Sequence, residues 1–342
     1  MDVEQLENTA LQLVAPGKGI LAADESFGTI EKRFNAVGIE STEESRRDYR
    51  EMLFTTPDVG EFLSGVILFD ETIRQESSEG TPLPEILESQ GIIPGIKVDK
   101  GAKDMALFPG EKVTEGLDGL RERLEEYRDL GARFAKWRAV ITIDEGIPTR
   151  MCIDANAHAL ARYAALCQEQ DLVPIVEPEV LIDGDHSIER CYEVTQQTLH
   201  STFDELHEHR VEFSGMLLKP NMVISGKEAP QQAGVEEVAR ATVECLLRTV
   251  PAAVPGIVFL SGGQSDRQAT AHLNAMNALY ENLPWELSFS YARALQDLPM
   301  KTWKGDPSNV EEAQRTFLHR ARMNSAARYG SYSQEMEGDL AA

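Results

Sequence analysis

The stretch Ser64-Gly65-Val66-Ile67-Leu68-Phe69 is almost continuously apolar. A strand with one face in water alternates apolar and polar residues, whereas a strand covered on both faces does not. The stretch therefore predicts a strand of a parallel sheet that is buried on both sides.

Seven further runs rich in Val, Ile, Leu and Phe follow the same pattern. The eight predicted strands are Lys18–Ser26, Ser64–Glu71, Gly91–Lys100, Ala132–Ile143, Leu172–Leu181, Phe213–Val223, Gly256–Gln264 and Glu286–Arg293. Helical apolar spacing separates most of them, as in Leu117–Leu130, Thr149–Gln170, His186–His209 and Val235–Val250. Eight strand–helix units predict an α/β fold, a closed (β/α)8 TIM barrel. The competing fold is an open doubly wound sheet, but no G-x-G-x-x-G follows the first strand.

The domain prediction is a single barrel over residues 1–342, with an N-terminal helical extension. The last predicted helix is Ser308–Arg328, and we expect a short mobile C-terminal tail from about residue 330. Ser41-Thr42-Glu43-Glu44 resembles a capping box in which Ser41 caps a helix and Glu44 reaches back.

Composition excludes several classes of function. The net charge of −24 argues against nucleic acid and anionic membrane as partners. No apolar stretch approaches the roughly 20 residues of a membrane helix. The N-terminus lacks a signal-peptide pattern, and the four cysteines form no CxxC pair. We expect a cytoplasmic protein, or a plastid stromal one if this is a processed form.

Ionisable residues stand at the carboxyl ends of the predicted strands, the edge at which barrel enzymes carry their active sites. They are Asp24, Lys97, Lys136, Arg138, Glu177, Glu179, Lys219 and Arg293. Side chains two apart on a strand share a face, so Lys136 lies with Arg138, and Glu177 with Glu179. A lone lysine near a strand end usually extends to water. Several charges in a consistent register favour a functional site instead, because burying them unpaired is costly.

Lys219 ends the short apolar run in Gly215-Met216-Leu217-Leu218-Lys219-Pro220-Asn221-Met222. A crowded, partly dry amine among other cations gives up its proton readily and becomes a nucleophile toward carbonyls. We therefore take Lys219 as the candidate nucleophile.

Two segments suit phosphate groups. After the seventh strand comes Leu260-Ser261-Gly262-Gly263, whose paired glycines let backbone N–H groups approach an anion, and Arg293 from the eighth strand could clamp it. The alternative is a simple tight turn. After the first strand, Lys32-Arg33 follows Ser26-Phe27-Gly28-Thr29. It is either a second anion site or an exposed helix face.

Metal-binding patterns are weak. His207-Glu208-His209 places its histidines two apart on a helix, where side chains do not share a face. Asp183-Gly184-Asp185-His186 reads as a turn and helix start, and no HExxH, EF-hand or Walker A pattern occurs. We predict a mechanism without metal or cofactor.

From about Leu11 to about Tyr329 the chain resembles the class I fructose-1,6-bisphosphate aldolases of eukaryotic type. The segments that carry the resemblance are APGKGILAADES from Ala15, GIKVDK from Gly95, FAKWR from Phe134, PIVEPE from Pro174, LLKPNM from Leu217 and LSGGQS from Leu260. The resemblance implies reversible cleavage of fructose 1,6-bisphosphate to dihydroxyacetone phosphate and glyceraldehyde 3-phosphate, and an oligomer, tetrameric or dimeric.

The resemblance also implies roles for individual residues. Lys219 would form the Schiff base, Glu177 would act as acid and base with Glu179 in support, and Lys136 would aid proton transfer. Asp24 and Lys97 would position the sugar hydroxyls, with Arg138 beside them. One phosphate site would comprise Leu260, Ser261, Gly262, Gly263, Ser290, Ala292 and Arg293, and the other Ser26, Thr29, Lys32 and Arg33.

Two departures from the family pattern stand out. Many members have glycine at the position of Ala292, and animal members end in a functional tyrosine, whereas the last tyrosine here is Tyr332. Three alternatives stay open: a transaldolase, which two phosphate sites disfavour, a sedoheptulose-1,7-bisphosphate aldolase, and a non-catalytic scaffold that kept the barrel.

Overall fold

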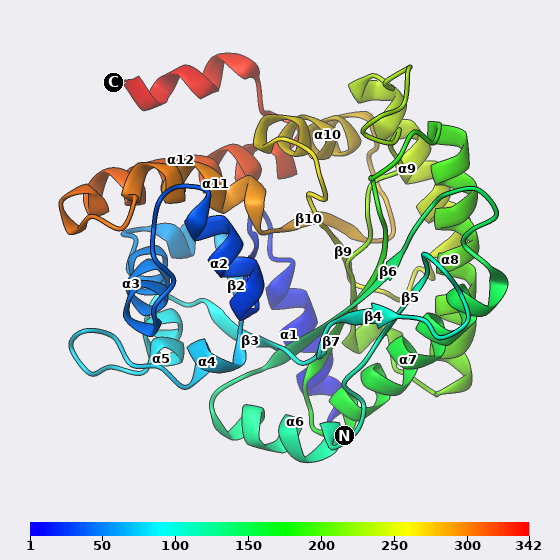
Figure 1. Cartoon of the computed structure of the whole chain (residues 1–342), viewed down its shortest axis with the longest axis horizontal. Coiled ribbons are helices and arrows are strands. Elements are labelled where there is room, and N and C mark those ends of the chain that lie inside the picture. The colour runs from blue at the N-terminus through cyan, green and yellow to red at the C-terminus, as the bar shows by residue number, and fades with distance from the viewer. Residues whose placement is uncertain (342) are drawn as a thin grey trace.

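Eight parallel strands close into a barrel in the computed structural model, which describes residues 1–341 (Figure 1). Their order around the barrel is β1-β10-β9-β8-β7-β6-β3-β2. The strands are β1 Gly19–Ala23, β2 Leu63–Leu68, β3 Ile93–Lys97, β6 Phe134–Ile141, β7 Val173–Val180, β8 Leu217–Leu218, β9 Gly256–Phe259 and β10 Glu286–Tyr291. Seven lie within a predicted run and β2 begins one residue before its run, so the predicted TIM barrel is confirmed and the open sheet is wrong.

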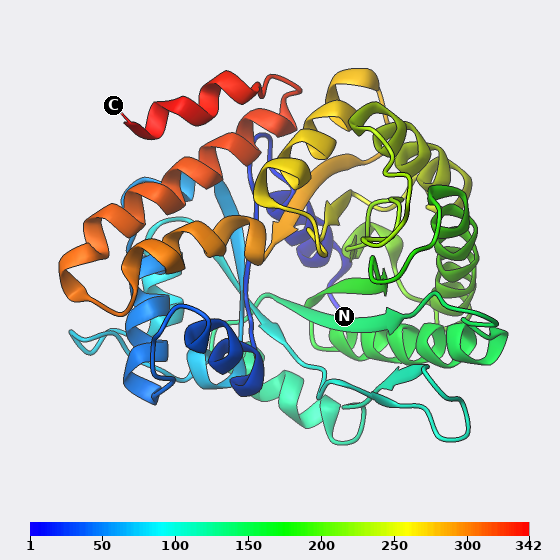
Figure 2. The same cartoon turned by 45° about the horizontal axis from the view of Figure 1, so that its top comes forward.

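Helices cover the barrel on its outside (Figure 2). They are α1 Val3–Leu13, α2 Phe27–Asn35, α3 Glu43–Phe54, α4 Asp70–Ile73, α5 Leu83–Ser89, α6 Leu120–Asp129, α7 Arg150–Glu169, α8 Ile188–Glu208, α9 Val235–Thr249, α10 Asp266–Leu279, α11 Arg293–Trp303 and α12 Val310–Arg328. Short 3-10 turns occur at Val59–Glu61, Phe213–Gly215, Pro307–Asn309 and Gln334–Ala341. No helix in residues 1–341 is both long and apolar enough to cross a bilayer.

The amino-terminal end of the barrel is apolar. Leu6, Ala10 and Leu13 of α1 are fully buried and pack in one cluster with interior residues such as Ile67 and Val258. Helix α1 thus closes this end with side chains that need no polar partners. The charged residues of the strands are left to gather at the opposite, carboxyl end.

Interior glycines make room for large side chains. An added Cβ at Gly95 would lie 2.3 Å from the Phe134 ring, and one at Gly19 would lie 2.5 Å from the Phe289 ring. Both aromatic rings are fully buried. Small and large residues thus alternate to fill the barrel interior. This packing explains why the strand sequences are nearly apolar but contain glycine.

Local details differ from the sequence predictions. The predicted cap at Ser41 is wrong by one residue: Thr42 caps α3 and exchanges hydrogen bonds with Ser45. A small antiparallel pair, β4 Ala102–Asp104 and β5 Lys112–Thr114, was not predicted, since three-residue strands carry little apolar signal. The single-domain boundaries and the mobility of the tail stay predictions.

Candidate active site

A cavity of about 1150 Å³ opens at the carboxyl ends of the strands. All but one of the predicted site residues line it. They are Asp24, Ser26, Thr29, Lys32, Arg33, Lys97, Lys136, Arg138, Glu177, Glu179, Lys219, Leu260, Ser261, Gly262, Ser290, Ala292 and Arg293. The exception is Gly263, whose α-carbon faces Lys227: an added Cβ there would lie 2.0 Å from the Lys227 side chain.

Four buried charges form the floor of this cavity. Lys219 at the end of β8 is only 3% exposed, and its Nζ lies 3.3 Å from Glu177 Oε1. The other oxygen of Glu177 lies 3.3 Å from Lys136 Nζ, which lies 2.7 Å from Asp24 Oδ2. The floor is therefore a chain in which two amines and two carboxylates alternate.

Two of the four floor residues, Lys136 and Asp24, are held in their charged forms. Burial works against the ionised forms, but attraction to Asp24, Glu177 and Asp99 outweighs it and raises the pKa of Lys136. Burial likewise opposes the Asp24 carboxylate, yet attraction to Lys136, Lys219 and Lys97 lowers its pKa to about 2. Lys136 is therefore a permanent cation and Asp24 a permanent anion at neutral pH.

Charged residues beside the floor are paired as well. Arg138 Nε donates to Glu179, and attraction to Glu179 and Glu177 overcomes burial and raises the pKa of Arg138. Lys97 Nζ lies 2.6 Å from Asp99 Oδ1. Asp99 was given no role from the sequence, although its spacing of two from Lys97 places both on one face of the chain.

One end of the cavity is built by the loops after β9 and β10. Gly262 has φ +55°, a left-handed conformation that suits glycine, and its carbonyl accepts a hydrogen bond from exposed Arg293. Ser290 Oγ is buried without a hydrogen-bond partner. Ala292 has φ −98°, a negative value that does not require glycine, although many family members have glycine at this position.

The other end begins at the N-terminus of α2. Ser26 and Thr29 hydroxyls lie 3.2 Å apart, and Lys32 is exposed. Arg33 is held differently: it pairs with Glu25, and its NH2 group lies 3.0 Å from Asp297 Oδ1.

Behind this end lies an arginine that sequence reasoning missed. Arg50 of α3 is 1% exposed and donates to the backbone carbonyls of Ala23 and Glu25. Its NH2 group also lies 3.6 Å from Glu25 Oε2. An arginine within an amphipathic helix gives no sequence signal for such a position.

Tyr332 does not take the place of a terminal tyrosine at the cavity. It is 8% exposed, its hydroxyl donates to Glu337 Oε1 at 2.9 Å, and it is not among the cavity's lining residues.

The fold and the floor define a (β/α)8-barrel protein with a buried lysine and carboxylate at its centre. The family described as Glycolytic, fructose-bisphosphate aldolase class-I, matches residues 5–342. The chain belongs to this family, so the resemblance and the predicted enzyme class, a carbon–carbon lyase, are confirmed.

Individual relatives agree with this placement. A probable fructose-bisphosphate aldolase class 1 of Xanthomonas campestris pv. campestris is 62% identical over 97% of this chain and 99% of its own. Cytosolic fructose-bisphosphate aldolase 6 of Arabidopsis thaliana is 54% identical over 96% of this chain and 92% of its own. Among solved structures, Plasmodium falciparum fructose-bisphosphate aldolase, in complex with TRAP and an inhibitor, has a TM-score of 0.95 and 52% identity. The match covers 97% of this chain and 96% of that one.

Proposed function

We propose that this protein cleaves fructose 1,6-bisphosphate reversibly to dihydroxyacetone phosphate and glyceraldehyde 3-phosphate through a Schiff base on Lys219, without a metal. The observation that carries the proposal is the position of the Lys219 amine, buried at the end of β8 and 3.3 Å from Glu177. A buried amine beside a carboxylate has both the nucleophile and the proton carrier that imine formation needs.

The first steps form the imine. The Lys219 ammonium first passes a proton to the Glu177 carboxylate 3.3 Å away, and the resulting amine adds to the C2 carbonyl of the open-chain sugar, giving a carbinolamine. Glu177 donates a proton to the C2 hydroxyl, which leaves as water and gives an iminium ion. Because Lys136 stays protonated 3.3 Å from Glu177, it stabilises the carboxylate that this step produces.

Bond cleavage follows from the same pair of groups. Glu177, now a carboxylate, accepts the C4 hydroxyl proton, and the C3–C4 bonding electrons move to the iminium nitrogen. The products are an aldehyde and a neutral enamine, so no free carbanion forms. Asp24, ionised with a pKa of about 2, accepts hydrogen bonds from sugar hydroxyls rather than transferring protons. Glu179 positions Arg138, to which it is bonded.

The two ends of the cavity would bind the two phosphates. At one end, the start of α11, Arg293 and the unpartnered Ser290 hydroxyl can meet a phosphate. At the other, Lys32 and the start of α2 can do so; the Ser26 side chain makes no capping bond to the helix backbone there and contacts the Thr29 hydroxyl instead. Holding both phosphates would orient C2 to C4 over Lys219.

We extend the proposal to assembly and location. A homo-oligomer, tetrameric or dimeric, and a cytoplasmic location stay proposals that the family suggests. The names of two related Arabidopsis thaliana aldolases, which include the word cytosolic, support the location.

The test is turnover of fructose 1,6-bisphosphate by the purified protein in excess EDTA. We expect undiminished activity. Activity that EDTA abolishes and Zn²⁺ restores would contradict the mechanism, and an inert protein would support the scaffold alternative. Comparing kcat/KM for fructose and sedoheptulose bisphosphates would show which sugar is the main substrate.

A further inference from the structure

Two histidines and a glutamate meet on the outer layer of the barrel, where α7 and α8 lie side by side (Figure 1). His158 belongs to α7, Glu205 to α8, and His209 directly follows α8 as its C-cap. Glu205 and His209 are four apart and so share one face of the helix. His158 reaches the same place from 47 residues away in the chain.

The three side chains are already in contact. His158 Nδ1 lies 3.0 Å from Glu205 Oε2, and His209 Nδ1 lies 3.5 Å from the same oxygen. The two imidazole rings are 5.0 Å apart, edge to face. One ligand atom from each residue can be chosen so that all three lie within 4.8 Å of one another.

Within residues 1–338, whose side chains the structure describes, no lysine or arginine lies within salt-bridge distance of Glu205. The side chains within that distance of its carboxylate are those of the two histidines. His209 Nδ1 is also 2.8 Å from the Glu205 backbone carbonyl, an acceptor. With Nδ1 donating to this carbonyl, His209 would offer Nε2 to a metal, as metal-binding histidines do.

We propose that His158, Glu205 and His209 bind one divalent transition-metal ion per chain, Zn²⁺ best, and that the ion joins α7 to α8. Two imidazoles and a carboxylate are a donor set that tetrahedral zinc accepts, with water at the fourth position. Zinc–ligand bonds of about 2.0–2.2 Å require the three atoms to move closer together. The His158 side chain is 51% exposed and can make this movement.

This site is separate from the catalytic cavity, because none of its three residues lines that cavity. The expected effect of the metal is therefore on stability and not on turnover. Sequence spacing does not indicate this site: the neighbouring pair His207 and His209 points to different sides of the helix, and His158, which meets Glu205, comes from α7.

The experiment uses full-length protein stripped with EDTA and freed of chelator. Zn²⁺ is titrated by calorimetry, and Co²⁺ is titrated by visible absorption, which reports tetrahedral coordination. The variants are His158→Ala and His209→Ala, with His207→Ala, an exposed residue of the same helix, as the matched control. Circular dichroism melts without metal show that each variant folds.

We expect one Zn²⁺ per chain, a rise in Tm with Zn²⁺, and unchanged aldolase activity. His158→Ala and His209→Ala should each weaken Zn²⁺ binding by about tenfold or more and abolish the Co²⁺ spectrum, while His207→Ala should change neither. Equal affinity in all four proteins, or weakening by His207→Ala alone, would overturn the proposal. So would one ion per two chains.

Discussion

Charged side chains lie both on the floor of the cavity and at its rim, the exposed edge that carries Arg293. The two regions differ in how deeply these side chains are buried and in whether they are paired with an opposite charge. On the floor, Asp24, Lys136, Glu177 and Lys219 are buried and each lies against an opposite charge. At the rim, Arg293 is exposed and, among the described residues, has no carboxylate within salt-bridge distance. Paired buried charges are costly to disturb, whereas an unpaired surface cation is free for an anionic ligand. Floor and rim should therefore respond differently to substitution.

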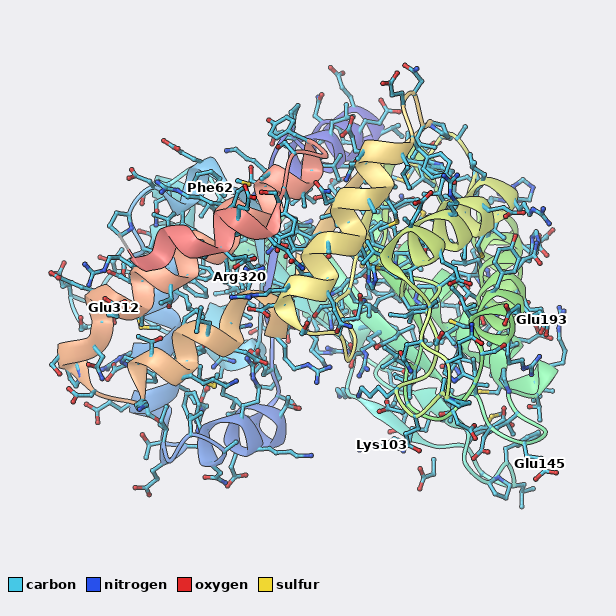
Figure 3. The ribbon with its side chains drawn as sticks, turned by 90° about the horizontal axis from the view of Figure 1, so that it is seen from above. Phe62, Lys103, Glu145, Glu193, Glu312 and Arg320 are labelled. Atoms are coloured by element: carbon cyan, nitrogen blue, oxygen red, sulfur yellow. The ribbon has the colours of Figure 1, made fainter. Side chains whose placement is uncertain are left out.

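Lys219→Arg should give the largest loss. It keeps the positive charge but removes the amine that can form an imine, so we expect kcat to fall by at least ~10⁴-fold. Steady-state assays with fructose 1,6-bisphosphate measure this, with Lys103→Arg, an exposed lysine on β4, as the control (Figure 3). Retention of a tenth of the activity would show that the floor does not contain the nucleophile.

Asp24→Asn should damage both activity and stability. It leaves the buried Lys136 cation without the partner 2.7 Å away, which should lower the free energy of unfolding by about 3 kcal/mol. We expect kcat/KM to fall by about 10²-fold or more, since the hydroxyl-orienting carboxylate is lost. Urea denaturation and kinetics on one preparation test both effects. A variant as stable as the parent would show that the buried ion pairs of the floor are not costly to disturb, contrary to the proposed difference between floor and rim.

Arg293→Ala should affect binding alone. Loss of one charge-assisted contact to phosphate costs about 2 kcal/mol, so KM should rise by about 30-fold with Tm unchanged. Arg33→Ala is the informative comparison, because Arg33 is paired with Glu25 and Asp297. It should lower Tm and raise KM less than Arg293→Ala does. The reverse ranking would mean that pairing does not decide which arginine serves the substrate.

The smallest expected effect is a pH dependence of stability that arises from His272 of α10. His272 contacts Gln264 Oε1 at 2.5 Å, and burial lowers its pKa from 6.5 to about 4. As pH falls below about 6.5, the unfolded chain takes up this proton and the folded protein does not, so stability is lost. Between about pH 7 and about pH 5 the loss is about 2 kcal/mol. His272→Gln should show a correspondingly shallower pH slope in urea melts. An unchanged slope would show that His272 does not cause the loss of stability at low pH.

The barrel and most of its site residues could be predicted from the sequence. The strands are buried on both faces and so are apolar, and the reactive residues stand at their carboxyl ends. Even the very short β8 was found, although Lys219-Pro220 cuts it to two residues, since proline cannot donate to a ladder. The spacing of two placed Lys136 with Arg138, and Glu177 with Glu179, at the cavity.

The side-chain contacts between residues far apart in the chain could not be predicted from the sequence. Arg33 meets Asp297 from 264 residues away, and His158 meets Glu205 from 47 residues away. Such contacts depend on how neighbouring helices pack, which periodicity does not encode. The shift of the α3 cap from Ser41 to Thr42 has a different cause, since adjacent hydroxyl residues are nearly equivalent as caps.

The most direct test of the account is reductive trapping. The protein is incubated with dihydroxyacetone phosphate, reduced with borohydride, digested and mapped by mass spectrometry. We predict a single modified residue, Lys219, and no label in Lys219→Arg. Label on Lys136 or Lys97 in the parent protein, or no label in an active preparation, would contradict the central claim.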